Sequence, residues 1–330
     1  MLNWGIIGTS FISDTLAEAI GNDPEAQVVA VAGRRPEALA EFQEKYEIAR
    51  TYLDYDAFLA DETVDVIYIA LPNHLHHSYV VKAAAAGKHI LCEKSLSIDM
   101  PKTEEALAAV AKQGVFFMEG LMYLVHPLLA KLVGLLQAQA VGSIRTISGQ
   151  YCADIAQFVN PGSKGAIYNL GCYPASLLHL VLQTAFGAEA FSAYQLAAFG
   201  NLSSYDGNVC DTLVQLRFAN GVLAQLHCAE DYGETAVFTI TGDAGEIRFV
   251  SNPWLPTATD NIIELNRYGQ GVERIEVSAK GDAFFYEVRL VRDCIERGLL
   301  EAPRPAPRQS DSHEIMELLT RWETAVLASY

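Results

Sequence analysis

Short apolar runs alternate with helical patterns over the first 120 residues. The apolar runs are rich in Val and Ile, and each is followed by a segment with helical periodicity, which is typical of βαβ units and a parallel sheet. Prolines at 36 and 101 suit the first turns of two of the helices. The predicted strands are 2–7, 27–32, 50–53, 64–71, 89–92 and 115–118, and the predicted helices are 12–20, 36–46, 75–86 and 101–112.

The rhythm changes after residue 120. Two alternating runs within 211–230 meet at Asn220-Gly221, a strong hairpin signal, and residues 235–247 read as a second pair of strands. Helices are expected at 127–137, 174–186 and 284–297 and at the C-terminus, with a strand at 144–152. The sequence therefore predicts an α/β protein of two domains, 1–120 with a parallel sheet and 121–330 with a mostly antiparallel open sheet.

Composition agrees with a folded protein of this size. The chain has 330 residues, of which 51% are hydrophobic and 19% charged, and at roughly 150 residues per domain two domains are expected. The net charge of −17 disfavours nucleic acid and anionic membranes as partners. Six scattered cysteines without a C-x-x-C pair, and the lack of a basic leader or a long apolar stretch, predict a reduced, cytoplasmic, unanchored protein.

A strand-to-helix turn at residues 5–13 is the first candidate binding site. An apolar strand there meets small residues before a helix, so free backbone N–H groups can face a pyrophosphate. Ser10 and Ser13 stand where the second and third glycines of the dinucleotide fingerprint belong, so a tight turn without ligand is the alternative. The cofactor-binding residues predicted from this turn are Gly8, Thr9, Ser10, Phe11 and Ile12.

The end of the second predicted strand bears on the choice of dinucleotide. NAD-preferring folds usually carry an acidic residue there that bonds the ribose hydroxyls. This chain has Arg34 and Arg35 instead, and guanidinium groups form charge-assisted hydrogen bonds with a 2′-phosphate. We therefore expect NADP, with NAD as the alternative. One of the two arginines, Arg35 in particular, can equally be a solvated residue at a helix start.

Two further segments carry a more specific pattern. Residues 70–77 read ALPNHLHH and residues 87–94 read GKHILCEK. The pattern resembles the glucose-fructose oxidoreductase, inositol dehydrogenase and rhizopine-catabolism (Gfo/Idh/MocA) family, whose members carry Pro-Asn then His after their fourth strand and Glu-Lys-Pro after their fifth. The similarity continues through 119–127, 171–174 and the Asn220-Gly221 hairpin, and is strongest to the branch of dihydrodiol dehydrogenases, anhydrofructose reductases and NADP-linked sugar dehydrogenases.

This resemblance implies a Rossmann domain followed by an α/β domain whose open sheet commonly forms a subunit interface, hence a homodimer or a dimer of dimers. It also implies hydride transfer between nicotinamide and a carbinol or carbonyl carbon of a sugar, polyol or cyclic diol. By the family motif, Lys94 would bond the reacting oxygen and Tyr173 would be the acid/base or substrate-orienting phenol. Further cofactor-binding residues implied are Leu71, Pro72, Asn73, His76, Glu93 and Lys94.

The implied roles agree with the chemistry. A departing or arriving hydride changes the charge on the substrate oxygen, so a cation and a proton donor must lie within hydrogen-bond reach. The structural alternatives are a surface lysine at a strand end for Lys94 and a packed aromatic residue for Tyr173.

Three positions depart from the family pattern. Ser95 replaces the proline that often follows the lysine in a cis peptide, so the aim of Lys94 can differ. Asn169 replaces a frequent aspartate; its amide can bind substrate but cannot exchange a proton near neutral pH, which excludes a relay through that residue. Leu124 replaces a frequent arginine, which favours a less polar or differently oriented substrate.

The histidines give weaker signals. His74, His76 and His77 begin a predicted helix without a matching set of cysteines or carboxylates, so no metal is expected. His76, and with it His74, is expected to face the cleft and His76 to contact cofactor and substrate. His126 precedes a helix-starting proline and is either an acid/base and substrate-binding candidate or a satisfied structural histidine.

These observations favour an NADP-dependent oxidoreductase that acts on a small carbohydrate-like substrate. The alternative is a dinucleotide-binding regulatory protein that has kept the fold and lost the reaction, because Ser95 and Asn169 both depart from the catalytic pattern.

Overall fold

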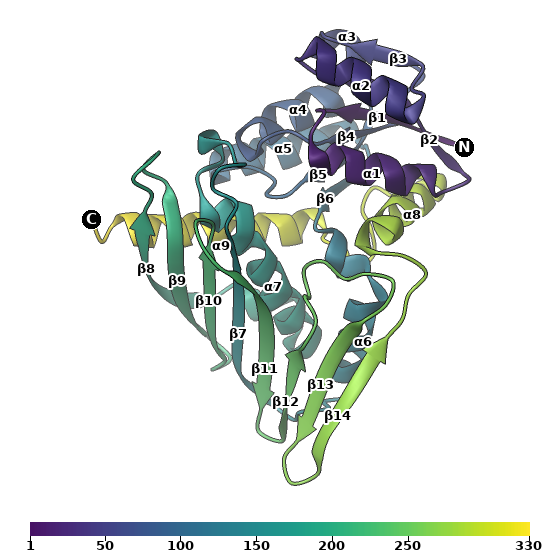
Figure 1. Cartoon of the computed structure of the whole chain (residues 1–330). Helices are drawn as coiled ribbons and strands as arrows, with labels where there is room; N and C mark the ends of the chain where they lie inside the picture. The colour runs from purple at the N-terminus through teal and green to yellow at the C-terminus, as the bar shows by residue number, and fades with distance from the viewer. The chain divides into compact units, whose positions relative to one another are not determined.

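The computed structural model describes all 330 residues, which form two compact units (Figure 1). The first unit combines Met1–Met122 with the later segment Phe284–Ser312, and the second combines Tyr123–Ala283 with His313–Tyr330. Both units are therefore discontinuous in sequence, a feature that the hydropathy pattern does not reveal. The boundaries 1–120 and 121–330 stay a prediction for independently folding domains.

The first unit is built on a six-stranded parallel sheet with the strand order β3-β2-β1-β4-β5-β6. This confirms the predicted Rossmann arrangement, in which the strand order reverses between β1 and β4. The strands are β1 (Leu2–Ile7), β2 (Ala26–Ala32), β3 (Arg50–Tyr52), β4 (Val66–Ile69), β5 (His89–Glu93) and β6 (Phe117–Gly120). The helices between them are α1 (Phe11–Gly21), α2 (Pro36–Tyr46), α3 (Tyr55–Leu59), α4 (Asn73–Ala85) and α5 (Met100–Gln113).

Burial explains why these strands read as continuous apolar runs. All four residues of β4 are buried, as are Trp4, Ile6 and Ile7 of β1, because helices cover both faces of a parallel sheet. The carboxyl ends of parallel strands meet at one edge of the sheet. The turns after β1, β4 and β5, which hold Gly8, Leu71 and Lys94, therefore follow neighbouring strands at that edge.

The segment Phe284–Ser312 completes the first unit. It contains most of α8 (Ala283–Glu296), whose Arg292 donates two hydrogen bonds of 2.5 and 2.7 Å to the buried carboxylate of Asp23. The backbone N–H of Phe117 in β6 also donates to the carbonyl oxygen of Leu300 at 3.2 Å.

The second unit is built on an open eight-stranded sheet with the order β14-β13-β12-β11-β7-β10-β9-β8. Only the β7–β10 pair is parallel, which confirms the predicted, mostly antiparallel sheet. The strands are β7 (Ile144–Ala153), β8 (Tyr194–Leu202), β9 (Val209–Phe218), β10 (Leu223–Ala229), β11 (Glu234–Gly242), β12 (Gly245–Phe249), β13 (Asn261–Arg267) and β14 (Gly271–Val277).

Helices of the second unit lie on one face of this sheet: α6 (Pro127–Gln137), α7 (Cys172–Phe186) and α9 (Gln309–Leu327) from His313 onward (Figure 1). Helix α7 packs tightly on β7, because a Cβ atom at Gly149 would lie 2.9 Å from Cβ of Pro174. The Trp322 indole N–H of α9 donates to Oγ1 of Thr212 in β9 at 2.9 Å. No helix of the chain is long and apolar enough to span a bilayer.

Candidate functional site

The turn after β1 can be built only with glycine at position 8. Gly8 has φ +108°, and a Cβ atom there would lie 2.5 Å from the carbonyl oxygen of Ala70. The two serines that replace fingerprint glycines have a different function: the N–H of Ser10 donates to Oγ of Ser13 at 3.2 Å, as part of a capping box at the start of α1. Serines therefore form the helix start where the fingerprint has glycines.

The outer surface of this turn suits an anionic ligand. Thr9, Ser10 and Ile12 are half-buried, and Phe11 is 79% exposed. The first N–H groups of α1 have no intrahelical acceptor, and the positive end of the helix dipole lies at the same place. The five residues predicted to bind cofactor here, Gly8 to Ile12, are thus brought together around one helix N-terminus.

Arg34 follows β2 and is exposed. Burial raises the pKa of Tyr55, while the hydrogen bond and charge of Arg34 lower it, so the guanidinium lies beside that phenol. Burial lowers the pKa of His74, and the charge of Arg34 lowers it further. The guanidinium is therefore positioned between α3 and the start of α4. Arg35 occupies the N-cap position of α2 and is also exposed.

Tyr55 was not found from the sequence, because the five-residue helix α3 that carries it is too short to show periodicity. Its ring packs edge-on against Tyr79 of α4, with centroids 5.2 Å apart. The two aromatic rings border the surface next to Arg34.

The turn after β4 leads through Leu71 and Pro72 into α4. Pro72 takes the N-cap position with φ −59°, and Asn73 begins the helix with 8% of its surface exposed. Leu71 and Pro72 are half-buried. The sequence placed the start of this helix at residue 75, two residues late.

His76 was expected to face outward from this turn, but it faces inward. Its side chain is fully buried, with Nδ1 2.8 Å from the carbonyl oxygen of Ser95 and Nε2 2.6 Å from the carbonyl oxygen of Leu71. The imidazole thus joins the turn after β4 to the turn after β5. Burial lowers its pKa to about 4, although the two carbonyl groups raise it. The neutral ring therefore donates a hydrogen bond to one of the two carbonyl oxygens and packs against the other. The prediction that His76 faces the cleft and contacts cofactor and substrate is therefore wrong, and the residue instead holds two loops together.

Glu93 ends β5 and is 8% exposed. The Tyr68 hydroxyl donates to its Oε1 at 2.5 Å, and the Lys94 N–H donates to its Oε2 at 3.3 Å. Burial raises the pKa of this carboxyl, although Lys94 and Tyr68 lower it. Most of Glu93 is therefore engaged within the first unit.

Lys94 is half-buried and is held in a fixed backbone segment. The Lys94–Ser95 peptide bond is cis. The carbonyl of Ser95 is contacted by His76, and the N–H of Leu96 donates to Oε1 of Glu119 at 2.9 Å. The two residues that follow Lys94 are thus held by buried polar groups.

Glu119 was missed as a site residue. It is 1% exposed in β6, and burial raises its pKa to about 7, with Ser312 and the Leu96 N–H lowering it and Glu93 raising it. The available signal was a lone acidic residue within the apolar run 115–122. Such a residue is costly to bury unless it has hydrogen-bond partners.

In the second unit, Tyr173 lies in the first turn of α7 and is 6% exposed. Its ring is surrounded by other aromatic residues: the centroid of Tyr151 is 5.1 Å away, that of Tyr123 5.8 Å and that of Trp254 6.2 Å. The Tyr123 hydroxyl also donates to the backbone carbonyl of Tyr173 at 3.0 Å. Tyr173 is therefore rigidly packed.

Asn169 lies four residues before Tyr173, in a π-helical turn (Ile167–Gly171) that leads into α7. Its Nδ2 donates to Oε2 of Glu230 at 2.7 Å, and both residues are buried. Burial raises the pKa of Glu230 to about 7, and the Asn169 hydrogen bond lowers it. Glu230 was not predicted from the sequence; it follows β10 and is 61 residues from its partner.

His126 is the N-cap of α6 and is fully buried. Its Nδ1 accepts the N–H of Leu128 at 3.2 Å, so Nε2 carries the proton and donates to the carbonyl oxygen of Gly281 at 3.2 Å. Burial also lowers the pKa of the ring. Of the two interpretations, this geometry fits the satisfied structural histidine and does not fit an acid/base residue.

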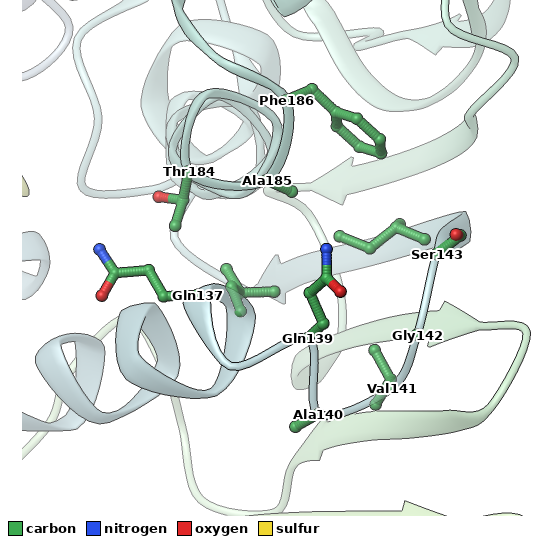
Figure 2. Close-up of a pocket in the computed structure, with 11 residues that line it drawn as sticks. Gln137, Gln139, Ala140, Val141, Gly142, Ser143, Thr184, Ala185 and Phe186 are labelled. Carbon is green, nitrogen blue, oxygen red and sulfur yellow. The ribbon is translucent and has the colours of Figure 1, made fainter.

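A pocket of the second unit lies at the other end of α7. Figure 2 shows it between the C-terminal ends of α6 and α7 and the start of β7, with Gln137, Ser143, Thr184 and Phe186 among its lining residues. None of the predicted site residues lines this pocket.

Family comparisons match both parts of the chain. Residues 2–121 match the model described as the oxidoreductase family with an NAD-binding Rossmann fold, and residues 129–248 match the GFO/IDH/MocA C-terminal domain. Among curated relatives, trans-1,2-dihydrobenzene-1,2-diol dehydrogenase of Sus scrofa is 28% identical over 317 residues, covering 92% of this chain and 90% of the relative. An uncharacterized oxidoreductase of Rhizobium meliloti is 30% identical over 267 residues, covering 79% and 78%.

Among solved structures, a 3-ketoreductase from Actinomadura kijaniata in complex with NADP and TDP-benzene has a TM-score of 0.88 and 25% identity, and the match covers 98% of each chain.

Proposed function

Because the chain belongs to the GFO/IDH/MocA family of oxidoreductases with an NAD-binding Rossmann fold, we propose that it transfers hydride between NADP and a carbinol or carbonyl carbon of a sugar, polyol or cyclic diol. The observation that carries the proposal is the fixed segment around Lys94, whose neighbours Ser95 and Leu96 are held by His76 and Glu119.

The turn after β1 fits a dinucleotide. Gly8 lies against the backbone of residue 70 with no room for a side chain, and the first turn of α1 offers its N–H groups beside half-buried small residues and the exposed Phe11. Leu71, Pro72 and Asn73 line the neighbouring turn and are proposed to contact the same ligand. Glu93 is proposed to lie near the nicotinamide ribose. It would contact the ribose with the part of its carboxyl that the Tyr68 hydroxyl does not contact.

Arg34 supports NADP over NAD. The end of β2 carries no carboxylate that could bond the ribose hydroxyls. The guanidinium of Arg34 is exposed there and lies beside Tyr55. An exposed, oriented guanidinium favours a phosphate ester. The similar 3-ketoreductase was crystallised with NADP, which agrees with this choice. Arg35 is proposed as a weaker, second contact.

In the oxidation direction, the C–H bond of the carbinol breaks and its electron pair leaves with the hydrogen, while the hydroxyl proton goes to a base, so that a C=O bond forms. When bound, NADP supplies the hydride acceptor. We propose that the Lys94 ammonium donates a hydrogen bond to the substrate oxygen and stabilises its developing negative charge. Tyr173 is proposed to exchange the hydroxyl proton or to orient the substrate.

The substrate class is proposed from the relatives and from the surroundings of Tyr173. The relative from Sus scrofa is named for a cyclic diol, and the structural neighbour from Actinomadura kijaniata is a 3-ketoreductase in complex with NADP and TDP-benzene. In this chain, Tyr151 and Trp254 pack around Tyr173, and the apolar side chain of Leu124 is 2% exposed. Apolar neighbours favour a flat carbon ring over a highly charged substrate.

We also propose a homodimer or dimer of dimers through the open face of the eight-stranded sheet. Phe199 and Val237 on this face are 71% and 38% exposed, and exposed apolar side chains on an open sheet suit an interface between copies. Sedimentation equilibrium tests this assignment, since a monomer at micromolar concentration would contradict it.

A silent dinucleotide-binding regulator is the second candidate, favoured by Ser95 and Asn169. The two are separated by measuring NADPH oxidation and NADP reduction over a panel of aldoses, dicarbonyls and dihydrodiols, together with mass spectrometry of any nucleotide that the purified protein retains. The enzyme predicts turnover of at least one member of the panel. Tight NADPH binding with no turnover across the panel would support the regulator and overturn the enzyme.

A further inference from the structure

The carboxyl of Glu119 is fixed at the turn that carries Lys94. In the parallel pair of β5 and β6 the residue stands opposite Cys92, near the end of β5, and 1% of its surface is exposed. Its Oε1 accepts the N–H of Leu96, two residues after Lys94, at 2.9 Å. Its Oε2 is also buried but forms no hydrogen bond. One oxygen of this carboxyl is therefore held by the turn, and the other is left unsatisfied.

A buried carboxylate with an unsatisfied oxygen is stable only if a nearby cation offsets its charge, and otherwise it keeps its proton. The polar groups around Glu119 are Glu93 and Lys94 at the end of β5, the thiol of Cys92 in β5 and the hydroxyl of Ser312 in α9. Lys94 is the only cation among these groups. Burial raises the pKa of Glu93 and Lys94 lowers it, so the two carboxyls share one ammonium. Ionisation of both carboxyls therefore needs a further positive charge.

Oxidised nicotinamide carries such a charge, and reduced nicotinamide does not. The proposed function brings the ring to the end of β5, where Glu93 is proposed to contact its ribose. We propose that Glu119 sets the relative affinity of the site for NADP⁺ and NADPH: its carboxyl releases a proton to solvent when NADP⁺ binds and stays neutral when NADPH binds. The O–H bond of the carboxyl breaks, and its electron pair stays on the oxygen. This inference rests on the proposed function and makes Glu119 a specificity-determining residue for the redox state of the cofactor.

The charge state of Glu119 gives cofactor binding a pH signature. Burial raises the pKa of this carboxyl to about 7, with Glu93 raising it further and Lys94 lowering it. The ionised carboxyl attracts the positive nicotinamide, and it accumulates as the pH rises from 6 to 8. The ratio of the Kd of NADP⁺ to the Kd of NADPH should therefore fall over this range.

The other titratable groups around this turn do not produce the same signature. Burial lowers the pKa of His76 to about 4 and raises that of the Cys92 thiol well above its usual value, so both stay neutral between pH 6 and 8. Asp311, the residue before Ser312, forms an ion pair with Arg304. The 2′-phosphate, with a pKa of about 6, is common to both nucleotides and cancels in the ratio.

The test measures binding and needs no substrate. Fluorescence titration of the full chain with NADPH, and displacement of NADPH by NADP⁺, give both Kd values at pH 6, 7 and 8. If the ionised carboxyl binds NADP⁺ about tenfold more tightly, the ratio should fall about fivefold from pH 6 to pH 8. Glu119→Gln keeps an oxygen for the Leu96 N–H but cannot ionise, so its ratio should change by less than about 1.5-fold.

Two further variants separate Glu119 from other sources of pH dependence. Glu105→Gln is the control, because Glu105 is exposed on α5, and it should keep the fivefold change of the wild type, to within about 1.5-fold. Lys94→Met should also keep a pH-dependent ratio, but at higher pH, because Lys94 lowers the pKa of Glu119. A change that Lys94→Met abolishes and Glu119→Gln retains would assign the titration to the lysine and overturn the inference.

Proton release provides a second measurement if Glu119→Gln folds poorly. Calorimetry of the wild type at pH 7, in two buffers of different ionisation enthalpy, should find about 0.4 proton more released on binding NADP⁺ than on binding NADPH. Equal proton release with both nucleotides, a ratio that does not change with pH, or a pH dependence that folded Glu119→Gln retains would overturn this inference alone. A protein that binds neither nucleotide would instead overturn the proposed function.

Discussion

Nδ1 of His76 lies 2.8 Å from the carbonyl oxygen of Ser95, the residue that follows Lys94. Because the other ring nitrogen contacts the Leu71 carbonyl at 2.6 Å, one buried imidazole joins the turns that are proposed to hold the dinucleotide and the reactive lysine. This contact makes the position of Lys94 depend on a residue that is itself hidden from solvent.

His76→Gln should therefore lower kcat more than it weakens cofactor binding. A glutamine side chain reaches only one of the two carbonyl groups, so the Lys94 segment gains freedom. We expect kcat to fall at least about tenfold, with less than a threefold change in the Kd of NADPH. His77→Gln is the control, since His77 pairs with the exposed Glu105 at 2.7 Å and should leave kcat within about twofold. Equal losses in both variants would contradict a positioning role for His76.

Arg34→Gln should change the cofactor preference. Removing the guanidinium from the end of β2 should weaken NADPH binding about 10- to 100-fold, the range expected for a charged hydrogen bond, and leave NADH binding almost unchanged. Fluorescence titration with both nucleotides measures this. Arg35→Gln is the matched control and should have a smaller effect. A parallel loss of NADPH and NADH affinity would argue against a 2′-phosphate contact at Arg34.

Gly8→Ala should disrupt the first turn. The added Cβ would meet the Ala70 carbonyl oxygen at 2.5 Å in a backbone with φ +108°, so we expect a loss of stability of about 2 kcal/mol or more and a loss of NADPH binding. Gly21→Ala is the control, because nothing lies within 4 Å of its added Cβ and its φ is not positive. Thermal unfolding with and without NADPH separates the two effects, and a Gly8→Ala protein with normal Tm and binding would contradict the assigned turn geometry.

Glu119 predicts a pH dependence of stability. Burial raises its pKa from 4.5 to about 7, so the folded chain holds a proton that the unfolded chain releases between these values. The stabilising contribution is therefore full below about pH 4.5 and is lost as the pH rises through 7. Glu119→Gln stays neutral and should reduce the fall in unfolding free energy between pH 5.5 and 8 by about 1–3 kcal/mol. Glu105→Gln is the control, because Glu105 is exposed and its exchange should leave the fall in unfolding free energy unchanged. The burial argument would be contradicted if the unfolding free energy of Glu119→Gln had the same pH profile as that of the wild type.

The sequence predicted the parallel sheet well because buried strands and amphipathic helices leave periodic patterns. Strand β1 and helices α2 and α6 were predicted with the bounds that the structure shows. Helix α3 and strands β8, β13 and β14 were not placed, since a five-residue helix has little periodicity and these strands lie at or near the edges of an open sheet, where burial is partial.

Only those candidate site residues that belong to local sequence motifs were predicted. Gly8, Asn73, Glu93 and Lys94 lie at or near strand ends, so local sequence is enough to place them in the fold. Glu119 and Glu230 became visible only in the fold, because their partners are 23 and 61 residues away. The motifs gave the positions of His76 and His126 in the fold but not their surroundings. A single sequence does not show whether an imidazole is buried next to backbone carbonyl groups.

Transfer of deuterium from NADPH labelled at nicotinamide C4 to the product tests the central claim most directly. The measurement uses the best carbonyl substrate of the panel and NADPH that carries deuterium on the face of nicotinamide C4 from which hydride leaves. We expect mass spectrometry to find one deuterium on the new carbinol carbon for each labelled NADPH that is consumed. Lys94→Met should slow this transfer at least about 100-fold while the Kd for NADPH changes by less than about threefold. Consumption of labelled NADPH without deuterium in the product, or an undiminished rate in Lys94→Met, would contradict it.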